Sequence, residues 1–285
     1  MKIFNGLKSW VNERKNIKGS VGFVPTMGAL HAGHLALITQ SRQENDLTVC
    51  SIFVNPTQFN NAEDLQNYPR TEAADADKLR TAGCDVLLIP PAAEVYASIP
   101  RISFAFDGLD KAMEGQHRPG HFNGVALIVS KLLHWVNPDR AYFGQKDWQQ
   151  FVIVRQLVRD LSFPVSVIAC PTVREPDGLA LSSRNQRLSA AQRQQAPQIY
   201  RVLQAAATHL HAGISPAQVT QTAMETLAAT AGFDPEYFVV ADAETLQPIN
   251  KMPDTGRIIL ATAVYLRPVR LIDNLLIDVS SAKTP

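Results

Sequence analysis

The chain has 285 residues, of which 46% are hydrophobic and 19% charged, a composition typical of a globular protein with one large domain or two ordinary ones. Its formal net charge of +1 gives no global field for nucleic acid or an anionic membrane, which argues against an RNA-binding enzyme. The three cysteines lack metal-binding spacing and predict reduced core thiols. We expect no signal peptide and no membrane span, and therefore a cytoplasmic protein.

Strand-like and helical patterns alternate through the first three-fifths of the chain. Strands are predicted at 19–24, 47–54, 86–89, 140–143 and 165–170, and helices from about 35 and at 71–81, 122–136 and 149–161. This alternation predicts βαβ units, and hence an α/β fold with a Rossmann-like, doubly wound parallel sheet. Ligands of such sheets bind at the carboxyl ends of the strands.

The composition changes after Cys170. Residues 171–189 are polar and lack periodicity, which predicts a linker and active-site loop. A helix at 190–212, a second one begun by Ser215 and Pro216, and β-rich segments at 237–241, 257–266 and 271–277 predict a smaller α+β domain. We therefore expect domains at 1–174 and 175–285.

The most informative stretch, residues 25–34, reads PTMGALHAGH and lies between the first strand and the first helix. His31 and His34 are three residues apart and should share one face of the first helical turn. Free backbone N–H groups and the positive end of the helix dipole would point the same way, so the pattern predicts a phosphate site. His-x-x-His can also hold zinc, but no Cys or acidic partner stands at ligand spacing.

Further blocks of sequence extend this pattern along the chain. They are FVNPTQF at 53–59, YPR at 68–70, FGQKDWQQ at 143–150 and DGLALSSRN at 177–185. The first stretch resembles the HIGH signature of the nucleotidyltransferase superfamily, with Ala32 in place of Ile. All the blocks together resemble the pantothenate synthetase family over essentially the whole chain. The resemblance implies that ATP drives the joining of pantoate to β-alanine through pantoyl adenylate, with release of AMP and pyrophosphate.

The same resemblance implies roles for individual residues. His31 and His34 would donate to phosphate oxygens, and Lys146 would offset charge on the departing pyrophosphate. Ser182, Ser183 and Arg184 resemble a degenerate KMSKS loop and complete the catalytic set. The other implied ATP-site positions are Met27, Gly28, Asn55 (as a donor to phosphate), Gly144, Gln145, Asp147, Val173 and Leu181.

Pantoate and β-alanine would be bound by Gln58, Gln150 and Pro25. Neutral amides suit this task, because an Arg clamp would dampen the nucleophilicity of the carboxylate. Supporting roles are expected for Tyr68, Arg70, Glu114 and Arg118, and structural roles for His117 and His121.

Simpler structural alternatives remain open at several of these positions. Taken alone, Lys146 and Asp147 are typical of a surface ion pair at the start of a helix. The serines before Arg184 are likewise typical of a helix N-cap followed by a solvated arginine.

ATP is expected as a substrate with Mg²⁺ bound to it, so no protein metal ligand is predicted. The resemblance implies that residues 1–174 bind ATP and pantoate, that residues 175–285 act as a lid, and that the protein is a homodimer. Neither nucleic acid nor membrane is expected as a partner. The rival predictions are another HIGH-motif nucleotidyltransferase, which releases only pyrophosphate, and a regulatory module that binds nucleotide without catalysis.

Overall fold

The computed structural model describes residues 1–280. The chain forms two compact units, one from Met1 to Val173 and the other from Arg174 to the C-terminal end. Among the described residues, no helix is both long and apolar enough to cross a membrane.

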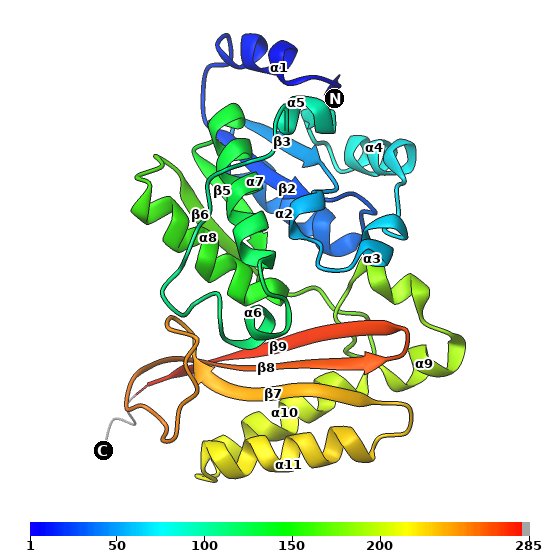
Figure 1. Cartoon of the computed structure of the whole chain (residues 1–285), viewed down its shortest axis with the longest axis vertical. Helices are drawn as coiled ribbons and strands as arrows, with labels where there is room; N and C mark the ends of the chain where they lie inside the picture. The colour runs from blue at the N-terminus through cyan, green and yellow to red at the C-terminus, as the bar shows by residue number, and fades with distance from the viewer. Residues whose placement is uncertain (281–285) are drawn as a thin grey trace. The chain divides into compact units, whose positions relative to one another are not determined.

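The first unit is built on a six-stranded parallel sheet with the order β1-β4-β3-β2-β5-β6; Figure 1 labels its strands β2, β3, β5 and β6. After β2 the chain moves outward through β3 and β4, and it returns to the other side of β2 to form β5 and β6. The predicted doubly wound sheet is therefore confirmed, with its topological switch point between β2 and β5. The strands are β1 (Lys2–Phe4), β2 (Val21–Thr26), β3 (Leu47–Ile52), β4 (Val86–Leu88), β5 (Arg140–Gly144) and β6 (Ser166–Cys170).

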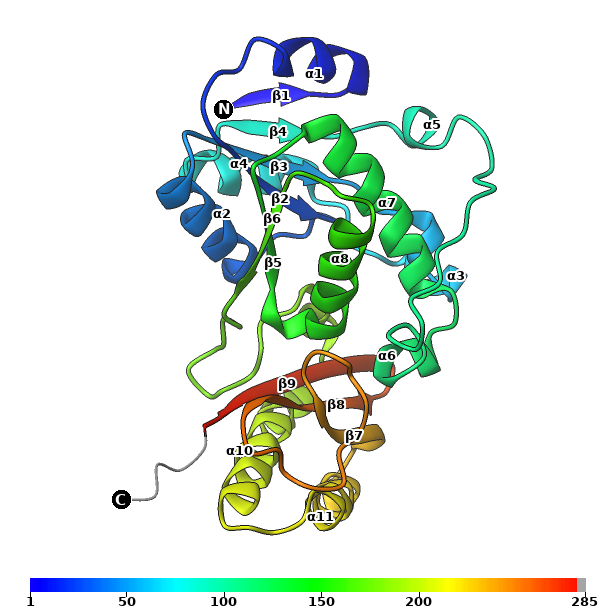
Figure 2. The same cartoon turned by 90° about the vertical axis from the view of Figure 1, so that its left-hand side faces the viewer.

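Helices cover both faces of this sheet, which Figure 2 shows nearly edge-on. On one face lie α2 (Ala32–Glu44) and α4 (Glu72–Thr81), and on the other α1 (Leu7–Arg14), α7 (His121–Val136) and α8 (Trp148–Asp160). Burial on both faces explains the continuous apolar sequence of β2. The shorter helices are η1 (Pro56–Gln58), α3 (Ala62–Gln66), α5 (Ala92–Val95), α6 (Met113–His117) and η2 (Gln145–Asp147).

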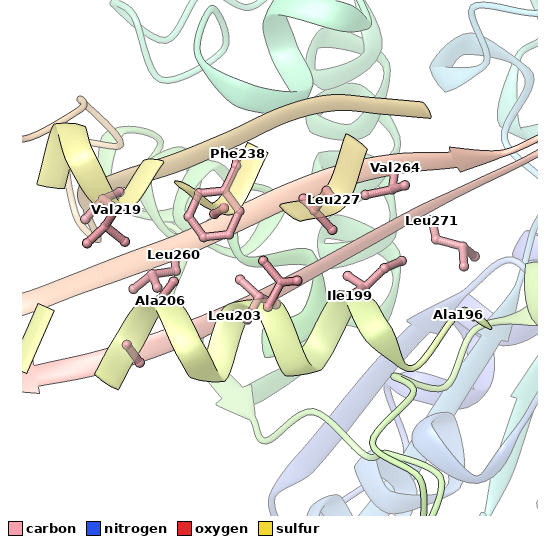
Figure 3. Packing of buried hydrophobic residues seen from close by; sticks show 14 of the residues in the cluster. Ala196, Ile199, Leu203, Ala206, Val219, Leu227, Phe238, Leu260, Val264 and Leu271 are labelled. Carbon is pink, nitrogen blue, oxygen red and sulfur yellow. The ribbon is translucent and has the colours of Figure 1, made fainter. Parts of the chain in front are cut away.

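The second unit has a three-stranded antiparallel sheet of β7 (Asp234–Asp242), β8 (Gly256–Leu266) and β9 (Val269–Val279). Two amphipathic helices, α10 (Gln198–His211) and α11 (Pro216–Ala229), pack on one face of it. Figure 3 shows the resulting core, in which Leu203 of α10 and Leu227 of α11 lie with Phe238 and Leu260 of the strands. The predicted smaller α+β unit is thus present.

Two details of the second unit differ from the prediction. The helix expected at 190–212 is two helices, α9 (Ala190–Gln195) and α10, because Pro197 has no N–H and cannot continue the first. The loop expected at 171–189 is partly regular, since Arg174 and Ala180 form an antiparallel bridge and η3 (Ser183–Arg187) follows. The Arg174 guanidinium donates to both carboxylate oxygens of Asp273, at 2.6 and 2.9 Å, which attaches this segment to β9.

Candidate active site

Three neighbouring strands, β3, β2 and β5, end at the same edge of the parallel sheet. The loops that follow them carry the first-unit residues predicted to bind ligand, at 27–34 after β2, 55–58 after β3 and 144–150 after β5. Val173 follows β6 in the same unit, and Pro25 lies within β2. This edge includes the switch point, where open α/β sheets bind their ligands.

The turn between β2 and α2 has a constrained backbone. Gly28 has a φ of +83° and Ala29 one of +51°, a left-handed conformation that costs a residue with a Cβ about 1–2 kcal/mol. The carboxylate of Asp75 accepts the N–H groups of Ala29 and Leu30, each at 2.8 Å. The Gly28 N–H donates to Thr26 Oγ1 at 3.2 Å.

His31 and His34 lie together at the start of α2, as their spacing predicted. Their ring centroids are 4.1 Å apart with an interplanar angle of 32°. His31 is the N-cap residue, and its Nδ1 accepts from the Gly33 N–H at 3.2 Å, while Nδ1 of His34 accepts from the His31 N–H at 3.3 Å. A neutral imidazole that accepts at Nδ1 carries its proton on Nε2, so each ring offers an Nε2–H donor.

Both imidazoles are neutral at physiological pH. Burial, followed by the charge of Lys146, lowers the pKa of His31 to about 4. Burial, followed by His31 and Lys146, lowers the pKa of His34 to about 3. Lys78 contributes in the same direction to both, whereas Asp147 raises the pKa of His31. The histidine pair is therefore accompanied by two ammonium groups, and Lys78 was not predicted.

The backbone at this helix start differs from the prediction. We expected the free N–H groups of this helix start to be available to phosphate. Instead the protein itself accepts the N–H groups of Gly28, Ala29, Leu30, His31, Gly33 and His34. The histidine capping box and Asp75 thus accept N–H groups that a helix start usually offers to an anion. Side chains are therefore the principal hydrogen-bond donors that this turn offers to a ligand.

Asn55 does not have the expected geometry of a phosphate donor. It is 1% exposed, and its Nδ2 donates to Gln58 Oε1 at 2.9 Å and to the Gly124 carbonyl at 3.1 Å. Its Oδ1 accepts from the Tyr96 hydroxyl at 2.7 Å. Because both amide hydrogens are used internally, Asn55 orients the side chain of Gln58 instead.

Gln58 is held through its backbone as well. The His121 Nδ1–H donates to the Gln58 carbonyl at 2.8 Å, and Arg118 donates to Nε2 of His121 at 3.2 Å. Burial and the neighbouring Arg118 lower the pKa of His121 to about 4, which keeps this ring neutral. On the side-chain end, Gln58 Nε2 contacts Met27 Sδ at 3.2 Å, so the structure brings Met27, Asn55 and Gln58 together.

Close packing of α7 on η1 completes this support. A Cβ on Gly124 would lie 2.3 Å from the Thr57 carbonyl oxygen and 2.7 Å from the Gln58 nitrogen. Only glycine allows this approach, which no local sequence pattern signals.

The other predicted residues of the first unit have distinct positions. Gly144 ends β5, Gln145 and Lys146 form η2 with Asp147, and Asp147 is also the N-cap position of α8. Gln150 is the third residue of α8 and is partly exposed, whereas Gln149 is buried and accepts from the Glu114 N–H at 2.9 Å.

Tyr68 is buried against Phe59, and Arg70 donates to the carbonyls of Leu65, Gln66 and Tyr68, a structural role. His117 ends α6.

The remaining predicted group lies in the second unit. Ser182 caps η3 by accepting the Arg184 N–H at 3.3 Å, and Ser183 is buried. The cap predicted as the structural alternative is therefore present, and it fixes the backbone next to Arg184. Leu181 precedes this turn and is partly exposed.

No group of three or more His, Cys, Asp or Glu side chains within residues 1–280 has the geometry of a metal site.

The chain is similar to known proteins over nearly its whole length. The sequence model of the Pantoate-beta-alanine ligase family matches residues 1–276. A pantothenate synthetase from Porphyromonas gingivalis is 47% identical over 278 residues, which cover 96% of this chain and 99% of that protein. One from Herpetosiphon aurantiacus is 48% identical over 256 residues, covering 90% and 92% of the two chains.

Solved structures of proteins from the same family also match this chain. The pantothenate synthetase from Thermus thermophilus has a TM-score of 0.89 and 44% identity, covering 96% of this chain and 99% of that one. A pantoate-β-alanine ligase from Francisella tularensis, complexed with β-γ ATP and β-alanine, has a TM-score of 0.79 and 36% identity, with 97% of each chain covered. The resemblance found in the sequence motifs is confirmed: the chain belongs to the pantoate-β-alanine ligase family.

Proposed function

We propose that this chain condenses pantoate with β-alanine at the expense of ATP, by way of pantoyl adenylate, and releases AMP and pyrophosphate. The observation that carries the proposal is the pair of neutral imidazoles at the switch point of the sheet, accompanied by Lys146. Family membership and the ATP and β-alanine complex of the Francisella relative support the same chemistry.

In the first step, a carboxylate oxygen of pantoate attacks the α-phosphorus of ATP, and the bond to pyrophosphate breaks. The Nε2–H groups of His31 and His34 donate to phosphate oxygens as charge moves onto them, and Lys146 balances the charge of the leaving group. Such preorganised donors stabilise the transition state more than the ground state. In the second step the β-alanine amine attacks the acyl carbon, loses a proton, and displaces AMP.

Other residues bind and orient the reactants. Gln58, held by Asn55 and His121, would bind pantoate together with Gln150 and Pro25. The nucleotide would lie along the loop after β5 and near β6, on Gly144, Gln145, Asp147 and Val173, with Met27 beside it. In the second unit, Leu181, Ser182, Ser183 and Arg184 would meet the phosphates when residues 175–285 act as a lid over the site of residues 1–174.

ATP would enter with Mg²⁺ held by phosphate oxygens and water, a coordination that needs no all-protein cage. We further infer a homodimer that works in the cytoplasm, as the family resemblance implies.

The decisive experiment is exchange of labelled pyrophosphate into ATP with pantoate present and β-alanine absent. Exchange that depends on pantoate, followed by AMP release when β-alanine is added, supports the proposal. Exchange that requires β-alanine contradicts the two-step order. Formation of pyrophosphate without any AMP would identify another nucleotidyltransferase, and ATP binding without exchange would identify a regulatory module.

A further inference from the structure

Helix α4 contacts the turn that precedes the histidine pair, although neither the motifs nor the proposed mechanism includes this helix. Its residue Asp75 has a fully buried side chain. Oδ2 accepts from the Ala29 N–H at 2.8 Å and from the Thr71 hydroxyl at 3.0 Å, and Oδ1 accepts from the Leu30 N–H at 2.8 Å. A group surrounded by donors in this way is an acceptor-only carboxylate.

The same helix holds the carbonyl side of the turn. Lys78 Nζ donates to the Leu30 carbonyl at 2.7 Å and lies 4.0 Å from Asp75 Oδ1. One turn of α4 therefore binds the N–H of Ala29 and both polar groups of Leu30. These are the backbone groups directly before His31.

The conformation held in this way is one that the local sequence disfavours. Ala29 has a φ of +51°, and a Cβ on Gly28 would lie 3.3 Å from Asp75 Oδ2. A side chain with a Cβ in the left-handed region persists only where its surroundings over-determine it. Two charge-assisted hydrogen bonds, donated by the Ala29 and Leu30 N–H groups to the buried carboxylate, supply that constraint.

We infer that Asp75, with Lys78 beside it, is a positioning residue that presets the His31 and His34 donors by fixing the Ala29–Leu30 turn. The inference rests on the proposed function in that these donors are the ones that meet the phosphates of ATP. Loss of the carboxylate should let the His31 N–H leave Nδ1 of His34, and so misplace both rings.

The test is Asp75→Asn, which keeps the volume of the side chain but turns one acceptor into a donor facing a backbone N–H. We expect kcat for pantoate-dependent exchange to fall about 100-fold, the loss typical of a misplacement of about 1 Å. The KM for pantoate should stay within about two-fold of wild type, because Gln58 is held by other elements.

A spectroscopic readout separates this effect from a general loss of activity. In ¹⁵N-histidine spectra, His31 and His34 of the wild type should show the Nε2–H tautomer, and Asp75→Asn should mix the two tautomers. The matched control is Asp139→Asn at the other end of β2, where Oδ2 accepts the Val21 N–H at 2.7 Å. It should lower the melting temperature and leave kcat and both histidine spectra unchanged.

If Asp75→Asn does not fold, Thr71→Val removes only the hydroxyl that orients Asp75 and should reduce kcat about ten-fold, roughly the loss of one hydrogen bond to a charged group. Wild-type protein that lacks pantoate-dependent exchange would refute the proposed function, while its histidine spectra would still test the role of Asp75. An active wild type whose Asp75→Asn variant, or Thr71→Val variant, keeps full kcat and the same histidine tautomers would overturn the inference.

Discussion

Replacing Gly124 with alanine would push a methyl group into the backbone that carries Gln58. The added Cβ would lie 2.3 Å from the Thr57 oxygen, 2.5 Å from the Thr57 carbonyl carbon and 2.7 Å from the Gln58 nitrogen. These are backbone atoms and cannot rotate away, and ordinary contact begins at 3.4 Å. The 3₁₀ turn η1 therefore has to move by about 1 Å, a displacement that can cost about 100-fold in rate.

The displaced turn includes Gln58, and its N-cap residue Asn55 donates to the Gly124 carbonyl. Both the Gln58 amide and this hydrogen bond would therefore shift. We expect kcat/KM for pantoate to fall about 100-fold, with the Kd for ATP changed by less than about three-fold because the histidine pair lies on another loop. Overpacking should also lower the free energy of unfolding by about 1–3 kcal/mol.

The assay is pyrophosphate exchange at varied pantoate, with calorimetric titration of ATP in the absence of pantoate. Gly213→Ala is the matched control, since its Cβ meets nothing within 4 Å and its φ of +83° makes the change destabilising without touching η1. It should lower stability by about 1 kcal/mol and leave the kinetics unchanged. A Gly124→Ala variant with wild-type pantoate kinetics would refute the argument from close packing.

Three further predictions concern the imidazoles and the amide. His34→Ala should lower kcat for adenylation by about 10²–10³ with little change in the Kd for ATP, measured by exchange and calorimetry; a loss confined to ATP binding would make His34 a ground-state ligand instead. Because His31, His34 and His121 have folded pKa values of about 4, 3 and 4 against 6.5 for an ordinary histidine, the unfolded chain binds more protons below pH 6.5. The free energy of unfolding should therefore fall from about pH 6.5 toward pH 4. In urea titrations, His34→Gln should make this fall shallower than in wild type. If the free energy of unfolding changes equally with pH in wild type and in His34→Gln, the low pKa of His34 is contradicted. Gln58→Glu should weaken pantoate binding far more than Gln58→Ala, since like charges repel by several kcal/mol at an effective dielectric of about 20; a glutamate variant that binds pantoate as well as wild type would place Gln58 outside the substrate site.

The parallel sheet could be predicted because its central strands β2 and β3 are mostly buried and rich in apolar residues, and helical patterns alternate with the strands. β1, by contrast, is a three-residue edge strand with two exposed residues, and α1 carries few apolar residues, so neither left a periodic signal. The break between α9 and α10 had a signal in Pro197 that the helical periodicity around it obscured.

In the candidate site too, features set by local sequence could be predicted, and features set by the packing of distant elements could not. The proximity of His31 and His34 follows from helical geometry, so their spacing was sufficient. Asp75 binds the N–H of Ala29, which lies 46 residues earlier in the chain, and Gly124 packs against Thr57. Both contacts depend on how distant elements pack, and no local sequence pattern indicates them. The capping box of two histidines was also unexpected, because imidazole is not among the usual capping side chains.

The neutral state of the two imidazoles bears on how fast product leaves. A cation 4 Å from a product charge would add about 4 kcal/mol of attraction at an effective dielectric of about 20, and that attraction would persist after the bond has broken. A neutral Nε2–H adds about 1.5–3 kcal/mol net to a bound anion, yet it can follow charge as it develops. Donors of this kind would hold pyrophosphate less tightly than imidazolium groups would, so the strong electrostatic attraction for the leaving group is left to the neighbouring Lys146.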